Sequence, residues 1–108
     1  MPVYNDKNIE QEVAINPVSV VKFCSRWDAA CRSMEDPFKQ ISDEVRAAKF
    51  YECDINANQQ FASAHKITKV PTTMIFIKGK PTAKVEGFNT KRSLREQIEY
   101  IIKKYTYQ

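Results

Sequence analysis

The feature that most constrains the fold is the β-branched run Val-Ser-Val-Val-Lys-Phe at residues 18–23. Asn16-Pro17 precedes the run and marks the start of a strand. The run is apolar enough to be buried on both faces, as the central strands of parallel sheets are. Helices must then cover both faces of the sheet, which predicts a layered α/β fold.

Alternating helical and strand patterns occupy the rest of the chain. They predict helices at 6–13, 29–48, 58–66 and 90–104, and further strands at 49–55, 72–77 and 82–85. Asp6 and Thr90 are the expected N-caps, and Pro37 is expected to kink its helix. Two strand-helix-strand crossovers, a hairpin and a last covering helix imply an α/β sandwich with a mixed sheet.

Length and composition limit the class of protein. The 108 residues suit a single domain spanning 1–108. No apolar run reaches the roughly 18 residues of a membrane helix, and the polar start lacks the apolar stretch of a secretory signal. The net charge of +4 comes from 17 basic and 13 acidic residues that are interspersed. We therefore expect an intracellular protein with a solvated, mildly basic surface that binds neither nucleic acid nor membrane.

Cysteine and histidine usage argues against a metal site. Cys24, Cys31 and Cys53 have neither metal-site spacing nor the density of a disulfide framework, which fits a reducing compartment. His65 has no second ligand spaced for a metal and is expected on the surface. No metal and no cofactor are predicted.

Two segments resemble the thioredoxin family. Residues 23–31, Phe-Cys-Ser-Arg-Trp-Asp-Ala-Ala-Cys, are similar to the strand-to-helix segment in which thioredoxins carry Trp-Cys-Gly-Pro-Cys, and Trp27 and Cys31 match. Val70-Pro71-Thr72 is similar to the cis-proline signature of the family. The resemblance, which covers roughly residues 13–104, implies the thioredoxin fold, a central mixed sheet of four to five strands flanked by helices. The only two glycines, Gly79 and Gly87, fall at the family's hairpin glycine and at the glycine after the fourth strand.

The departures from the family concern the redox site. Asp28 replaces the first cysteine, Ala29-Ala30 replaces Gly-Pro, and the segment from Cys31 to Pro37 is one residue longer than usual. The resemblance implies that the first cysteine attacks a substrate disulfide and the second resolves the mixed disulfide. A carboxylate at Asp28 can cap the helix but cannot attack sulfur. We expect a disabled dithiol, with Asp28 as an N-cap and Cys31 as a buried, inert thiol.

Lys22 is a second departure, because it occupies the place of the family's buried acid. A buried ammonium group needs a partner, and the neighbouring strand offers Glu52, so a Lys22–Glu52 ion pair is our hypothesis. Cys24 and Cys53 could each replace the missing partner of Cys31, but packing roles are expected for both.

The binding surface of the family is retained in the sequence. The positions that hold an extended peptide in thioredoxins correspond here to Trp27, Val70, Pro71, Thr72, Gly87 and Phe88. The leading hypothesis is a non-catalytic adaptor or light chain that binds a protein partner in a larger cytoplasmic assembly, for example of the ciliary dynein type. The alternative is a monothiol thiol-disulfide oxidoreductase in cell redox homeostasis that uses Cys31, or a Cys24–Cys31 pair. A third hypothesis is chaperone-like binding of unfolded chains through Trp27 and Phe88.

Overall fold

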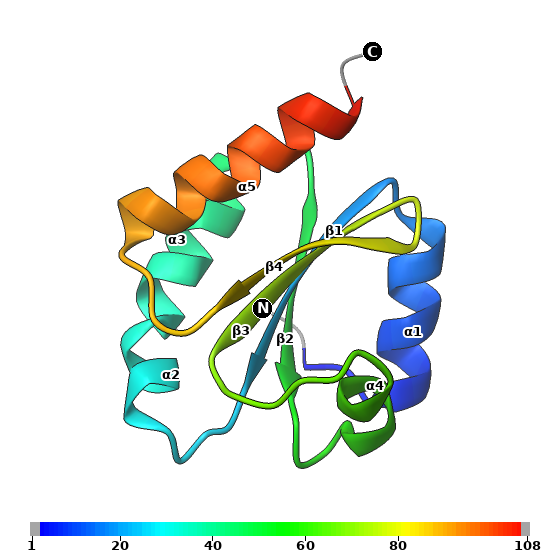
Figure 1. The fold of residues 1–108 in the computed structure, drawn as a ribbon, viewed down its shortest axis with the longest axis vertical. Helices are drawn as coiled ribbons and strands as arrows, with labels where there is room; N and C mark the ends of the chain where they lie inside the picture. Colours follow the sequence, from blue (N-terminus) through cyan, green and yellow to red (C-terminus); the bar gives the residue numbers. More distant parts are fainter. Residues whose placement is uncertain (1–2, 107–108) are drawn as a thin grey trace.

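A computed structural model describes residues 3–106, in which four strands form one mixed sheet in the order β2-β1-β3-β4 (Figure 1). β1 (Val18–Cys24) pairs in parallel with β2 (Lys49–Asp54) and antiparallel with β3 (Thr72–Ile77). β3 also pairs antiparallel with β4 (Lys80–Glu86), the strand at the far edge. The chain therefore has the thioredoxin fold that the resemblance implied.

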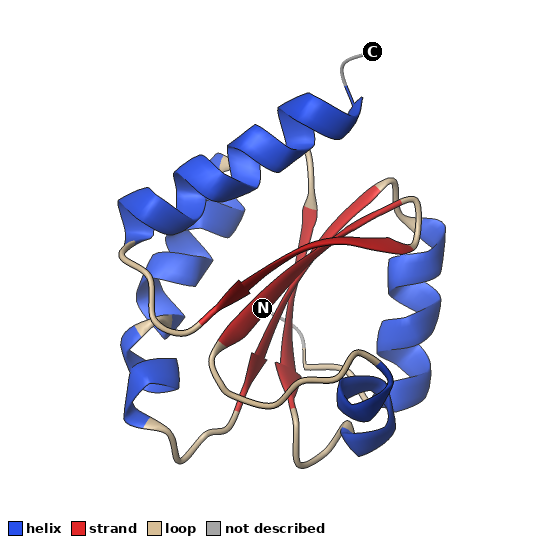
Figure 2. Ribbon diagram, in the orientation of Figure 1, coloured by secondary structure: helices blue, strands red, loops and turns tan. Residues whose placement is uncertain are grey.

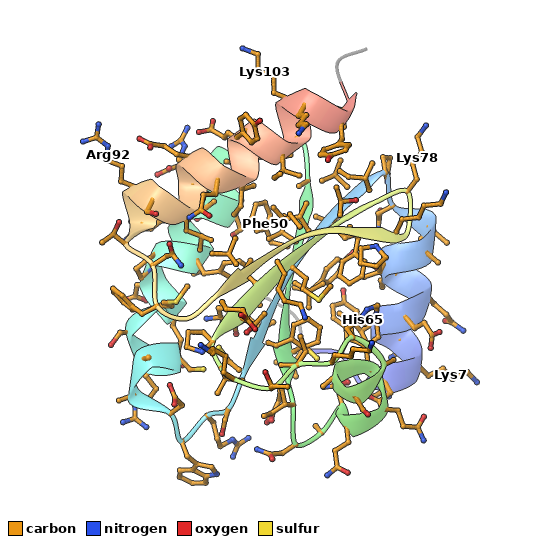
Figure 3. The ribbon with its side chains drawn as sticks, in the orientation of Figure 1. Lys7, Phe50, His65, Lys78, Arg92 and Lys103 are labelled. Carbon is orange, nitrogen blue, oxygen red and sulfur yellow. The ribbon has the colours of Figure 1, made fainter. Side chains whose placement is uncertain are left out.

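Helices cover both faces of the sheet (Figure 2). α1 (Asp6–Ile15) and α4 (Gln59–Ala64) pack on one face, and α3 (Glu35–Glu44) and α5 (Lys91–Thr106) pack on the other. Exposed basic side chains such as Lys7, Arg92 and Lys103 project outward from these helices (Figure 3). No helix within residues 3–106 combines the length and apolar character needed to cross a membrane.

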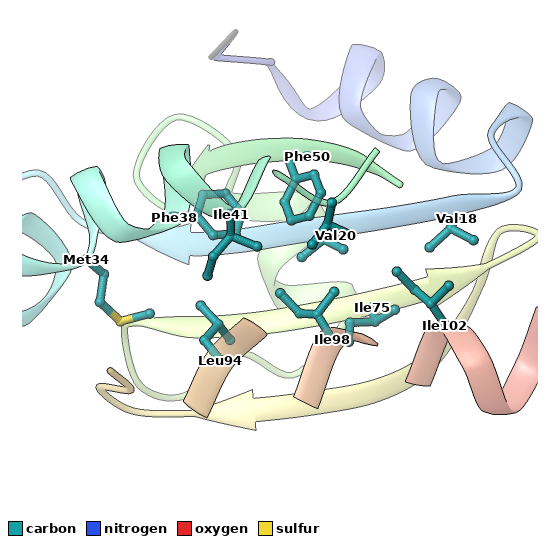
Figure 4. Packing of buried hydrophobic residues seen from close by; sticks show 11 residues of the cluster. Val18, Val20, Met34, Phe38, Ile41, Phe50, Ile75, Leu94, Ile98 and Ile102 are labelled. Carbon is teal, nitrogen blue, oxygen red and sulfur yellow. The ribbon is translucent and has the colours of Figure 1, made fainter. Parts of the chain in front are cut away.

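Two apolar clusters hold the layers together. Alternate residues of a strand point to opposite faces, so Val20 joins the cluster under α3 and α5 while Val21 joins the one under α1 and α4. The first cluster includes Phe38 and Ile98, both fully buried (Figure 4). Each such side chain contributes about 1.5–3 kcal/mol to folding. β1 is thus buried on both faces, as its sequence predicts.

The helix predicted at 29–48 is two helices. α2 spans Ala29–Ser33 and has Met34 as its C-cap, and α3 ends at Glu44. Pro37 is the third residue of α3, where its missing N–H is not needed, but its ring is incompatible with a continuous helix through Ser33. The expected kink at Pro37 is therefore a break one turn earlier.

The sequence suggested Asp6 as the N-cap of α1, and this prediction is wrong. Asn5 is the cap, because its side-chain oxygen accepts a hydrogen bond from the Asn8 amide at 3.0 Å. The Asp6 carboxylate instead accepts bonds from the amides of Gln60 at 3.0 Å and Phe61 at 3.4 Å, in the first turn of α4. The Asp6 carboxylate therefore hydrogen-bonds to a different helix, α4. A local sequence pattern cannot reveal this contact, because the two helices are far apart in the chain.

Candidate functional site

The strand register gathers the candidate site residues at one end of the sheet. Phe23, next to the end of β1, pairs with Thr72 at the start of β3, and Thr72 pairs with Glu86 at the end of β4. The Val70–Pro71 peptide is cis, and the Pro71 carbonyl accepts a 2.8 Å hydrogen bond from the amide of Gly87. Gly87 has a φ of +85°, which favours glycine at this turn.

Asp28 caps α2, as expected. Its backbone is extended, and its Oδ1 accepts a hydrogen bond from the Cys31 amide at 2.9 Å. Ala29 and Ala30 form the first turn, with Ala29 exposed and Ala30 half-buried. The residue that replaces the family's first cysteine therefore fixes the backbone of the second.

Cys31 lies beside a second thiol. Cys31 is 2% exposed, whereas Cys24, at the end of β1, is half-buried. Both cysteines line the same pocket. Burial, and after it the neighbouring Cys31 thiol, hold the pKa of Cys24 well above its usual range, although the nearby Lys22 ammonium acts in the opposite direction. Cys24 is therefore a protonated thiol near neutral pH.

The expected ion pair between Lys22 and Glu52 is present. Lys22 Nζ lies 2.9 Å from Glu52 Oε1, and the two residues are register partners on β1 and β2. The Lys22 side chain is 1% exposed and also lies over the Phe38 ring, with Nζ 5.2 Å from the ring centroid. Glu52 is 30% exposed, so the pair connects the buried face of the sheet to solvent.

A pocket of about 170 Å³ opens at this end of the sheet. Its lining includes both members of the ion pair, Lys22 and Glu52, and all three cysteines, Cys24, Cys31 and Cys53. Residues 22 and 24 share one strand face because they are two positions apart. The pocket therefore brings together Cys31 and Cys24, the pair that the sequence offered as an alternative to separate packing roles.

Cys53 belongs to the opposite face of the sheet. It packs with Phe23 and Phe61 in the cluster under α1 and α4, and it is 1% exposed. Burial raises the pKa of its thiol to about 12. The packing role expected for Cys53 agrees with this position.

The residues of the expected peptide groove differ in exposure. Trp27 is 77% exposed and Phe88 is 56% exposed, whereas Pro71 and Thr72 are buried. Val70 is half-buried between these extremes. Large exposed aromatic side chains beside a buried turn are typical of a surface that contacts a partner.

His65 is less exposed than the sequence suggested. α4 ends at Ala64, and the half-buried imidazole lies edge-on to Phe61 and Phe76, with ring centroids 4.7 and 5.1 Å away. Burial lowers the pKa of this imidazole. Within residues 3–106, no group of three or more His, Cys, Asp or Glu side chains is arranged to hold a metal ion.

Comparisons with known proteins agree with the fold. The thioredoxin family model matches residues 1–100. The chain belongs to the thioredoxin family. A thioredoxin of Mycoplasmoides gallisepticum is 25% identical over 97 residues, which are 90% of this chain and 97% of that protein. Thioredoxin-1 of Saccharomyces cerevisiae is 28% identical over 80 residues, which are 74% and 78% of the two chains.

Solved thioredoxins share the architecture. The crystal structure of thioredoxin from Trypanosoma brucei brucei superposes with a TM-score of 0.86 at 26% identity, over 95% of this chain and 91% of the other. This thioredoxin-family chain therefore keeps the sheet and helices of that solved thioredoxin.

Proposed function

We propose that this family member is a thiol-disulfide redox protein whose working residue is Cys31. The observation that carries the proposal is that Cys31 lines a pocket open to solvent together with a second cysteine, Cys24, and the Lys22–Glu52 ion pair. The relatives named thioredoxin support this redox alternative over the adaptor subunit that the sequence led us to put first.

The chemistry available without a cysteine at position 28 is thiol-disulfide exchange. A protein thiolate attacks one sulfur of a substrate disulfide, a mixed disulfide forms, and one substrate thiol leaves. Asp28 takes no part in the sulfur chemistry and holds the first turn of α2 through the Cys31 amide. Its substitution therefore removes one nucleophile without removing the site.

The test is turnover of a disulfide substrate such as insulin in the presence of a reducing system. We expect slow reduction by the wild-type protein, its loss in Cys31→Ser, and its retention in the matched control Cys53→Ser, whose thiol lies on the other face of the sheet. Turnover by Cys31→Ser equal to that of the wild type would contradict the proposal. Circular dichroism of each variant distinguishes lost chemistry from lost folding.

A second candidate function is binding of an extended peptide without sulfur chemistry. The exposure of Trp27 and Phe88 favours it, and Phe88 follows Gly87, whose amide donates to the carbonyl of the buried Pro71. This is the function of an adaptor or light chain in a larger cytoplasmic assembly, and a protein partner would bind by the side chains of the groove.

Binding and redox chemistry are separable by variants. A variant with all three cysteines changed to serine would keep peptide or partner binding if the groove alone acts, whereas Trp27→Ala would weaken it. Co-purification of a stoichiometric partner that is released by Trp27→Ala and retained by the cysteine-free protein would support the adaptor function. Loss of the partner from the cysteine-free protein would argue for mixed disulfides.

A further inference from the structure

We propose that Cys24 and Cys31 are the redox dithiol of this protein and form a reversible disulfide between the end of β1 and the first turn of α2. The inference deepens the proposed thiol-disulfide function and rests on it. It replaces a single working thiol by a pair separated by six residues, outside the two-residue spacing of the family motif.

Proximity of the two cysteines is the first support. Both line the same pocket, Cys24 from the end of β1 and Cys31 from the first turn of α2. Cys31 is also one of the neighbouring groups that raise the pKa of Cys24. A disulfide needs a sulfur–sulfur separation of about 2.05 Å and suitably directed side chains. Formation of the bond therefore requires the two side chains to approach each other within one pocket.

The backbone around the pair is held from both sides. The Cys24 carbonyl accepts a hydrogen bond from the Ile55 amide at 3.0 Å, and the Cys31 amide donates to Asp28 at 2.9 Å. Between them, the Asp28 amide donates to the Ser25 carbonyl at 3.1 Å and closes a turn. The geometry that brings the two thiols together is therefore built into the strand end and the helix cap.

Access to the pair is unequal. Cys24 is half-buried and Cys31 is 2% exposed, although both line the same pocket. An incoming disulfide therefore reaches Cys24 first, and Cys31 is in position to resolve. The third cysteine, Cys53, also lines this pocket, but it packs in the apolar cluster under α1 and α4, on the other face of the sheet.

The exchange balances with a disulfide substrate as the oxidant. The Cys24 sulfur attacks one substrate sulfur, the substrate S–S bond breaks, and the first substrate thiolate leaves with the Cys24 proton. The Cys31 sulfur then attacks the Cys24 sulfur, the mixed disulfide breaks, and the second substrate thiolate leaves with the Cys31 proton. Two electrons pass from the two protein thiols to the substrate disulfide, which becomes two thiols.

The deciding experiment maps the bonds formed in the wild-type protein by excess oxidised glutathione, followed by alkylation, digestion and mass spectrometry. We expect a Cys24–Cys31 peptide pair as the main oxidised product in the wild type and in the control Cys53→Ser. Cys31→Ser is expected to accumulate a stable glutathione adduct at Cys24, because nothing resolves it. Cys24→Ser is expected to lose at least tenfold in turnover of a disulfide substrate.

The alternative results separate the two proposals. If Cys24→Ser keeps wild-type turnover while Cys31→Ser loses it, Cys31 acts alone, so the dithiol inference falls and the proposed function stands. A bond from Cys31 to Cys53 would also overturn the inference. If wild-type protein forms no adduct and no disulfide, the proposed function falls with it. The wild-type bond map requires no variant and is unaffected by any variant that fails to fold.

Discussion

Asp28 and Cys24 divide between them what a first cysteine does in the family. Asp28 lies where the resemblance to the family places that cysteine, and it accepts the hydrogen bond of the Cys31 amide but carries no sulfur. Cys24 lies four residues earlier, at the end of β1, and places a thiol in the pocket that Cys31 also lines. Position and chemistry, which one residue combines in the family motif, belong to two residues here.

The capping role of Asp28 predicts a measurable loss of stability. Asp28→Ala leaves the Cys31 amide without its acceptor, and loss of such an N-cap costs about 1 kcal/mol. Asp28→Asn keeps an acceptor oxygen and is expected to cost much less. Urea unfolding of both variants measures the difference. Equal stability of Asp28→Ala and the wild type would mean that the cap contributes nothing.

The raised pKa of Cys24 predicts how sulfur exchange depends on pH. The groups facing this thiol are Cys31, Glu52 and Lys22, and burial outweighs the effect of the lysine. Only the thiolate attacks, and its fraction grows about tenfold per pH unit below the pKa. The rate of wild-type oxidation by excess oxidised glutathione should therefore rise about tenfold per unit from pH 7 to pH 9, without levelling off.

A plateau in that range would indicate attack by another thiol. Cys53→Ser serves as the control, since removal of a thiol on the opposite face should leave the pH profile unchanged. The oxidant itself has no group that ionises near its disulfide sulfur, so the slope reports on the protein thiol.

At the scale of helices and strands, local sequence patterns correctly predict the features that depend on residues close together in the chain. β3 occupies the predicted residues, and Thr90 caps α5 by accepting a 3.2 Å hydrogen bond from the Ser93 amide. The break at Met34 was missed because the apolar spacing of Met34 and Phe38 continues across it. Periodicity records which side chains face the core, and it does not record whether the backbone between them is continuous.

Asp6 illustrates the corresponding limit for a cap between elements. Its carboxylate serves α4, 54 residues later in the chain, so no neighbouring residue signals the bond. The candidate site likewise contains one arrangement that the sequence can predict and one that depends on how separate elements pack. The Lys22–Glu52 pair could be predicted from the register of two adjacent strands, whereas the meeting of Cys24 and Cys31 in one pocket depends on where α2 lies relative to the sheet.

The Asp6 bonds predict a local effect on α4. Asp6→Ala removes the acceptor for the Gln60 and Phe61 amides, and we expect a loss of about 1 kcal/mol with faster hydrogen exchange at these amides. Asp43→Ala, which removes an exposed carboxylate at the other side of the molecule, is the control. Unchanged exchange at both amides in Asp6→Ala would show that this contact does not stabilise α4.

At the scale of the whole molecule, the fold has two interior strands, β1 and β3, with an apolar cluster on each face of the sheet. β1 contributes Val20 to one cluster and Val21 to the other, and it ends at Cys24. The redox pair therefore lies where a buried strand meets the five-residue helix α2, in which Cys31 is the buried residue. A bond between Cys24 and Cys31 would fasten this short helix to the core.

The last prediction follows from that fastening. A disulfide between residues 24 and 31 closes a loop of eight residues, and the chain-entropy relation gives at most about 2.5 kcal/mol of stabilisation, less any strain. For a domain of this size the melting temperature of the oxidised protein should rise by up to about 10 °C over the reduced protein. Calorimetry of both forms measures the shift. Cys53→Ser should retain it and Cys24→Ser should abolish it, because only the latter removes a sulfur from the bond. An oxidised wild-type protein that melts below the reduced one would mean that closing the bond distorts the strand end more than the shortened loop stabilises it.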